Sequence, residues 1–379
     1  MAFISLGKID KNIISIFIGS IICFINRIFF KIDTQLFKQK IIPNFLASFC
    51  RIFTFIPKLI IEFRTKNIHD DKDQNRISIN TLKSEYKKRK EDITKGTWIY
   101  ILLSAFLVFI QGILVIYTLQ IEINLWIWDI FITCFFYYLI FKIKLYKHHY
   151  LSMILIILIG LFIDLFLENL QNDFANNFLF LLLAFLREII YSLNDVIYKY
   201  IMEKKYCSVY DLSLYIGAFD VILFGLFGLI NHFFLKIDDF EKYFSNFDGA
   251  ELLVCLGFII IQFIFNLSVL ITIKNYTPCH VFIIYVFGQF AYYIDFSIYS
   301  IILIICIVFI LFFSLVFNEI IEINICRLSY NTKKNITNRA ESEDTSLEGN
   351  LSRHSIDENY RIYVNSIELE EKDDLSSDL

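Results

Sequence analysis

The stretch IILIICIVFILFFSLVF at residues 301–317 is apolar along its whole length except for Ser314. A helix needs about 20 mainly apolar residues to cross the hydrocarbon core of a membrane, so this stretch is typical of a membrane-spanning helix. The run SMILIILIGLFI at residues 152–163 has the same character. Neither run alternates apolar with polar residues, as the strands of a membrane β-barrel would. These runs therefore predict helices that lie in a membrane.

The composition of the whole chain agrees with these runs. Hydrophobic residues make up 57% of the 379 residues and charged residues 20%, whereas soluble domains have about 45–50% and about 25%. The mean hydropathy is +0.58. This balance argues against a soluble enzyme and against a secreted module. No basic tract with interleaved aromatic residues suggests nucleic-acid binding.

Ten apolar segments are long enough to be considered as spans. They are residues 12–30, 41–61, 97–119, 123–141, 149–168, 177–199, 211–234, 250–273, 278–296 and 299–323. The sequence thus predicts an all-α polytopic membrane protein with about ten transmembrane helices. The predicted division is 1–61 (first two helices), 62–96 (cytosolic polar loop), 97–176 (rest of the first half), 177–325 (second five-helix half) and 326–379 (disordered cytosolic tail).

Basic residues in the connections predict the orientation. The segment 62–96 holds ten Lys and Arg residues, whereas the connection 169–176 holds none. Lys and Arg concentrate on the cytosolic side of membrane proteins, and this alternation persists over eight successive spans. Only the first connection, which includes Lys31 and Lys38, disagrees. We therefore expect both termini and the 62–96 loop in the cytosol, of either an endomembrane (Golgi or ER) or the plasma membrane.

The sixth span, FLFLLLAFLREIIYSLNDVIYKY (178–200), carries more charge than the others. Arg187, Tyr191, Asp195 and Lys199 recur every four residues, so they lie roughly along one helix face. Charge at membrane depth costs at least about 2.5 kcal/mol per residue on insertion scales, so such a face avoids lipid.

Two interpretations of this face stay open. In the first, Asp195 bridges Lys199 while Glu188 pairs with Arg187 across helices, which makes the face a self-satisfied ladder. In the second, Arg187 or Lys199 holds an anionic substrate and a carboxylate carries a coupling proton. Lys199 also lies near the cytosolic end, where its amine reaches water. Asn194 lies beside this face.

Other spans hold single polar residues. The candidates are Asp220, Gln262, Asn266 and Gln289 in the second half, and Gln111, Asp129 and Asp164 in the first. Hydrogen bonds between helices are the alternative to a substrate-binding role for each of them.

Three stretches resemble drug/metabolite transporters, particularly their nucleotide-sugar and triose-phosphate branch. LLLAFLREIIYSLNDVIYKYIMEKKYCSVYDLSLYIGAFDVILFGLFG (181–228) resembles that family's sixth and seventh helices, with Lys199 at the family's lysine position. ITIKNYTPCHVFII (271–284) resembles the junction of its eighth and ninth helices, and FNEIIEIN (317–324) resembles the end of its last helix. The resemblance covers about 97–325. It implies two five-helix inverted repeats with a substrate site between them.

The sequence lacks the patterns of common enzymes. It contains no GxSxG, P-loop, GxGxxG or HExxH motif, so we expect no catalytic residues, metal or cofactor. The eight cysteines form no CxxC pair, and most lie inside apolar runs, which favours a packing role.

The expected function is secondary transport of a small polar or anionic solute, of metabolite or sugar-nucleotide type, by alternating access. The alternative is a receptor or scaffold that binds partners through the 62–96 loop and the acidic tail; an intramembrane transferase ranks third. The expected partners are a small solute and membrane lipid, not nucleic acid, and homodimer formation stays open.

Overall fold

A computed structural model describes residues 4–6, 13–29, 41–61, 95–118, 125–143, 145–163, 178–235, 248–293, 298–323 and 332. The chain divides into two compact units. One comprises residues 1–9, 146–148 and 319–379, and the other comprises residues 10–145 and 149–318. The 62–94 part of the predicted loop, nearly all of the tail and Asp164 lie outside the described residues.

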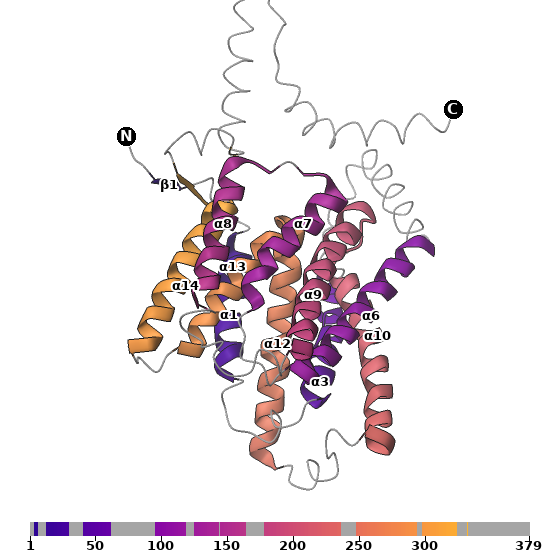
Figure 1. Ribbon diagram of the computed structural model, residues 1–379. Coiled ribbons are helices and arrows are strands. Elements are labelled where there is room, and N and C mark those ends of the chain that lie inside the picture. Colours follow the sequence, from indigo (N-terminus) through magenta and orange to yellow (C-terminus); the bar gives the residue numbers. More distant parts are fainter. Residues whose placement is uncertain are drawn as a thin grey trace, which may run out of the picture. The chain divides into compact units, whose positions relative to one another are not determined.

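The larger unit is a bundle of helices packed side by side (Figure 1). The helices are α1 (Ile13–Phe29), α3 (Ile41–Ile52), α6 (Lys95–Thr118), α7 (Asp129–Phe141), α8 (Lys147–Phe162), α9 (Phe178–Lys204), α10 (Val209–Ile230), α12 (Gly249–Asn275), α13 (Pro278–Gln289) and α14 (Ile298–Phe317). Short helical turns extend three of them: η1 (Leu125–Trp128), η3 (Asn231–Leu235) and η4 (Phe290–Tyr293).

Five helical segments within the described residues are long and apolar enough to cross a membrane, by length and composition. They are Ile41–Ile61, Gly96–Thr118, Val209–Leu235, Gly249–Asn275 and Ser300–Phe317. Many large apolar side chains on the bundle are exposed, among them Ile99 and Leu253, which are 66% and 71% exposed. Such contiguous apolar surface is typical of lipid contact and rare on soluble monomers. The chain is therefore a helical protein with the character of a multi-pass membrane protein.

A helix lies at each of the ten predicted positions, although the ends differ in places. The sixth predicted span stops at Lys199, whereas α9 continues to Lys204, since no Gly or Pro interrupts the pattern. The last predicted span is wrong beyond Phe317. There Glu319 takes a left-handed φ of 58°, which a helix cannot accommodate, and residues Ile321–Ile323 are extended.

The packing order of the helices positions the polar residues. Helix α3 packs against α10 and α12, and α1 packs against α12 and α13. Helix α9 packs against α6 and α7, so its polar face is enclosed by neighbouring helices. A separate apolar core joins η1, α7, α8, α13 and α14 around the fully buried side chains of Ile130, Ile156 and Leu303.

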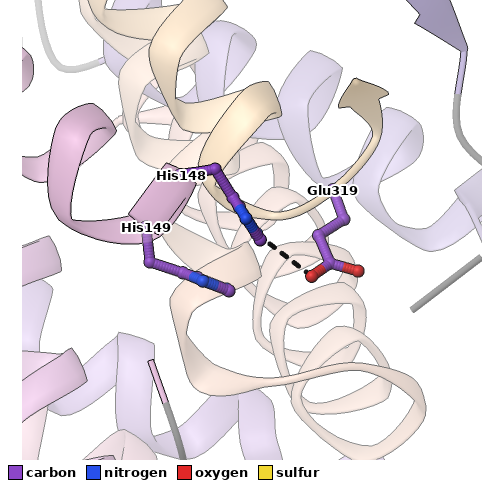
Figure 2. Close-up of side chains that lie close together, drawn as sticks. All are labelled: His148, His149 and Glu319. Atoms are coloured by element: carbon purple, nitrogen blue, oxygen red, sulfur yellow. Dashed lines mark hydrogen bonds and ion pairs between the residues drawn. The ribbon is translucent and has the colours of Figure 1, made fainter. Parts of the chain in front are cut away.

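The smaller unit contains an antiparallel pair of short strands, β1 (Ile4–Leu6) and β2 (Ile321–Ile323), in which Ser5 lies opposite Glu322. In the same unit the Nε2 atom of His148 lies 3.1 Å from the Oε1 atom of Glu319. Figure 2 marks this contact with a dashed line. The histidine is buried and the glutamate is 22% exposed.

Candidate functional site

The charged residues at the start of the α9 face pair with each other. Arg187 donates from Nε and Nη2 to the same Glu188 carboxylate oxygen, at 3.0 and 2.6 Å. Its Nη1 donates to Thr118 on α6, at 3.0 Å. The Arg187–Glu188 pair expected across helices therefore forms between sequence neighbours, with one bond to α6.

The middle of α9 is bound to its neighbours by polar and aromatic contacts. Ser104 on α6 donates to Asn194 over 2.5 Å, and both side chains are buried. The ring of Tyr191 meets the ring of Tyr285 on α13 edge to face, with the centroids 5.4 Å apart. These contacts fix the helix between α6 and α13.

The partners of Lys199 are neither Asp195 nor an open substrate site, which were the two interpretations of the sequence. Its amine donates to the backbone carbonyls of Lys274 and Tyr276, at 2.9 and 2.6 Å, and forms an ion pair with Glu203 at 2.5 Å. The last carbonyls of a helix have no partners inside it, and a cation stabilises them. Lys199 therefore ties α9 to the C-terminal end of α12, and Glu203 replaces the expected partner Asp195.

Asp129 lies at the first turn of α7 and faces α9. Its Oδ1 atom accepts hydrogen bonds from Ser192 at 2.5 Å and from Thr133 at 3.2 Å. All three side chains are buried. Hydrogen-bond donors favour the charged form of a carboxylate.

Asp195 is 4% exposed and lies one turn beyond Ser192 on the same helix. It is within electrostatic range of Asp129 and of Arg51 on α3. Within the described residues, neither a hydrogen-bond donor nor an ion pair is found on its carboxylate. Asp195 is therefore the least satisfied charged group on the α9 face.

Asp220 on α10 forms an ion pair with Arg51, whose Nη1 atom lies 3.0 Å from its Oδ2 atom. Asp220 is completely buried, and its second oxygen, Oδ1, has no hydrogen-bond partner. The ring of Tyr198 on α9 lies within electrostatic range of Arg51, Asp220 and Asp195. These contacts bring α3, α9 and α10 together around charged groups.

Two further links join the segment 53–61, which follows α3, to α10. Thr54 donates to the carbonyl of Tyr210 over 3.3 Å, and Lys58 forms an ion pair with Asp211 at 2.5 Å. Asp211 also belongs to the N-terminal cap of α10, where its backbone N–H donates to Ser208. Beside this cap, burial, together with Asp211, raises the pKa of the Cys207 thiol to about 12, although Lys58 opposes the shift.

Two of the remaining predicted residues make hydrogen bonds between helices. Gln262 donates to Asn26 on α1 over 3.1 Å, and Asn266 donates to the sulfur of Cys50 on α3 over 3.4 Å. Gln289 is buried at the end of α13. The structure therefore places Gln262 and Asn266 in contacts that hold α1 and α3 against α12.

We use the name polar centre for Arg51, Asp129, Ser192, Asp195 and Asp220. Sequence reasoning selected three of these residues and missed Arg51 and Ser192. In the sequence Arg51 is a charge that interrupts the second apolar segment, and Ser192 is a neutral residue that flanks the charged face of the sixth. Arg51 could have been found by the rule that a charged group in a span needs a partner in another span, whereas Ser192 carries no such signal.

A groove of about 390 Å³ lies elsewhere, on the outside of α8 and α14. Apolar side chains line it, among them Leu155, Phe162, Ile302 and Phe309. It holds none of the predicted site residues, and its chemistry suits an acyl chain better than a polar solute.

Comparison with known protein families gives no match for this chain. Likewise, no curated protein is significantly similar to it.

Proposed function

We propose that the chain is a secondary transporter that moves a small polar or anionic solute across a membrane by alternating access. The observation that carries the proposal is the polar centre. Charged side chains are buried in the middle of an apolar bundle, and they come from α3 and α7 in the first half and α9 and α10 in the second. Ionisable groups at such depth are expensive, and they commonly mark a substrate or ion path.

The packing of the helices supports an inverted repeat, and with it the proposed ten spans. In such a repeat α1 corresponds to α9, α3 to α10, α6 to α12 and α7 to α13. A two-fold operation exchanges the two helices of each pair. The contacts of α1 with α12 and α13 then correspond to those of α9 with α6 and α7. The contact of α3 with α12 corresponds to that of α10 with α6. Transporters built from such repeats bind their solute at the repeat interface.

The resemblance of residues 181–228 and 271–284 to drug/metabolite transporters belongs to the same proposal. It agrees with two five-helix halves and with a site on the α9 face. Within that site Arg187 and Arg51 are the cations proposed for an anionic solute, which would compete with their present partners, Glu188 and Asp220. Lys199 is bound to the end of α12.

The proposed orientation, with both termini in the cytosol, predicts the outcome of cysteine labelling in sealed cells. A membrane-impermeant maleimide should label Asn172→Cys from outside the cytosol, and it should label Ser355→Cys only after permeabilisation. The seven described native cysteines are buried and free of disulfides, which keeps their background low. Cys326 should be replaced by Ser in both variants. Labelling of both introduced cysteines from the same side would contradict the orientation.

Uptake by purified protein in liposomes tests the function. We expect one class among sugars, amino acids, organic anions, nucleotide sugars and organic cations to accumulate above protein-free liposomes. Asp195→Asn should then lower the uptake rate by about tenfold or more, which corresponds to about 1.4 kcal/mol. Asp248→Asn is the matched control, because Asp248 is an exposed helix cap and Asn caps equally well.

The same screen can overturn the proposal. If no solute class accumulates with protein that is folded and correctly oriented, the chain does not transport these solutes, and the receptor or scaffold alternative gains support. If uptake occurs and Asp195→Asn leaves its rate unchanged, the site lies elsewhere in the bundle.

A further inference from the structure

Asp195 has a chemical environment that differs from that of every other acid in the polar centre. Asp129 accepts bonds from Ser192 and Thr133, and Asp220 is paired with Arg51. Asp195 is 4% exposed, and no donor within the described residues reaches its carboxylate. A buried carboxylate without a donor or cation is too costly to remain charged, so it takes up a proton or a cation.

The groups facing Asp195 can be named for every helix around it. Asp129 from α7 and Arg51 from α3 act electrostatically on Asp195 itself. At one remove, Asp220 from α10 acts on Tyr198, Glu188 acts on Asp129 and is paired with Arg187, and Arg27 from α1 acts on Tyr285 of α13. Helix α6 has no charged residue from Gly96 to Thr118, and the charged residues of α12 are Glu251 and Lys274, close to its ends. The groups that act directly on Asp195 are therefore one carboxylate, Asp129, and one guanidinium, Arg51, which is paired with Asp220.

The charges of these groups do not balance. Arg51 neutralises one carboxylate, which in this structure is Asp220. Asp129 and Asp195 are left, and two neighbouring carboxylates in an apolar interior cannot both be ionised. Ser192 and Thr133 stabilise the charged form of Asp129, so Asp195 is the group that holds a proton.

We propose that Asp195 is the coupling-proton site of this protein and that Arg51 is its alternate counter-ion. The proposal deepens the proposed transport function and rests on it for its role in coupling. In the structure described here, Arg51 pairs with Asp220 and Asp195 is protonated. When Asp195 releases its proton to one side of the membrane, its carboxylate becomes charged and attracts Arg51 from Asp220. Asp220, left without its cation, takes up a proton in turn, so one O–H bond breaks at Asp195, one forms at Asp220, and no other covalent bond changes.

This exchange would couple the proton to movement of the helices. Arg51 lies on α3, whereas Asp195 and Asp220 lie on α9 and α10. Asp220 already has one unpartnered oxygen, so its hold on Arg51 is a single contact instead of a bidentate pair. Transfer of the guanidinium from α10 to α9 would shift α3 against both helices, which is the kind of two-state packing change that alternating access requires.

The experiment uses the full-length protein in liposomes and protons alone as the probe, so it requires no known solute. Infrared difference spectra are recorded between acidic and alkaline pH for the wild type and for Asp195→Asn. The C=O stretch of a protonated, buried carboxyl group lies above that of solvated carboxyl groups. We expect the wild type to show one such band that disappears at alkaline pH, and Asp195→Asn to lack it.

Two further variants make the test specific. Asp248→Asn removes an exposed acid and should keep the band unchanged. Asp220→Asn keeps the shape of the side chain and removes its charge, which frees Arg51 to neutralise Asp195. In that variant the band should disappear at lower pH than in the wild type, because a nearby cation favours the carboxylate. An Asp195 that is already ionised, or that Arg51 cannot reach, predicts no such shift.

The outcomes separate the coupling site from the transport function. A wild type without a titrating buried band, or an Asp195→Asn protein that keeps the band, overturns the proton site. If the band behaves as expected and the uptake screen finds no solute, the proton site stands and transport fails. If a solute is transported and its accumulation does not respond to a pH gradient, the coupling role fails.

Discussion

Replacing Arg51 with Met is expected to lower the free energy of unfolding by about 3–5 kcal/mol. The change leaves Asp220, which is completely buried, without the cation that lies 3.0 Å from its Oδ2 atom. Its Oδ1 atom is already unpartnered, so the carboxylate would lose its one neutralising contact in an apolar bundle. The measurement is denaturant unfolding in detergent micelles, followed by circular dichroism.

The double variant Arg51→Met, Asp220→Leu tests the cause. It removes both charges and replaces them with apolar side chains of similar size, so most of the lost stability should return. Lys58→Met is the matched control, because Lys58 lies just after α3 and pairs with the same helix, α10. Lys58 and Asp211 are 32% and 21% exposed, and such partly hydrated pairs contribute at most about 1 kcal/mol. If Arg51→Met costs no more than Lys58→Met, the buried pair does not stabilise the bundle.

The helices of this protein could be predicted because their signal is local. Apolar runs such as 301–317 set the position of each helix, and a helix lies at every predicted position. The polar face of α9 was also visible, since a helical period places Arg187 and Asp195 on one side. These features depend only on residues close together in the chain.

The partners of the polar residues could not be predicted, because they depend on contacts between distant segments. Lys199 binds the backbone carbonyls of residues 274 and 276. Every residue has a carbonyl, so the sequence does not indicate which ones bind a lysine. Ser192 gains its role only from Asp129, which lies 63 positions earlier. Arg51 and Asp220 are 169 positions apart, but each is a charge inside an apolar run, so their pairing was the one contact open to inference.

The close approach of α3 and α10 leads to the second large prediction. Gly217 on α10 lies against α3, and a Cβ atom added there would be 2.6 Å from the Cβ atom of Arg51 and 3.0 Å from the carbonyl oxygen of Ser48. Small residues allow the backbones of membrane helices to approach closely. Gly217→Ala is therefore expected to lower the free energy of unfolding by about 1–3 kcal/mol, because overpacked atoms must move apart.

Gly225 on the same helix provides the control, since a Cβ atom added there would meet nothing within 4 Å. Gly225→Ala should leave stability unchanged or raise it by up to about 1 kcal/mol, because Ala is the better helix former. Denaturant unfolding of the two variants side by side measures the difference, and equal effects would contradict the close contact.

Because Gly217 touches Arg51 itself, Gly217→Ala should also push the guanidinium away from Asp220. If it does, the infrared band of Asp195 should disappear at lower pH in Gly217→Ala and not in Gly225→Ala, which would link the packing of α3 on α10 to the proton.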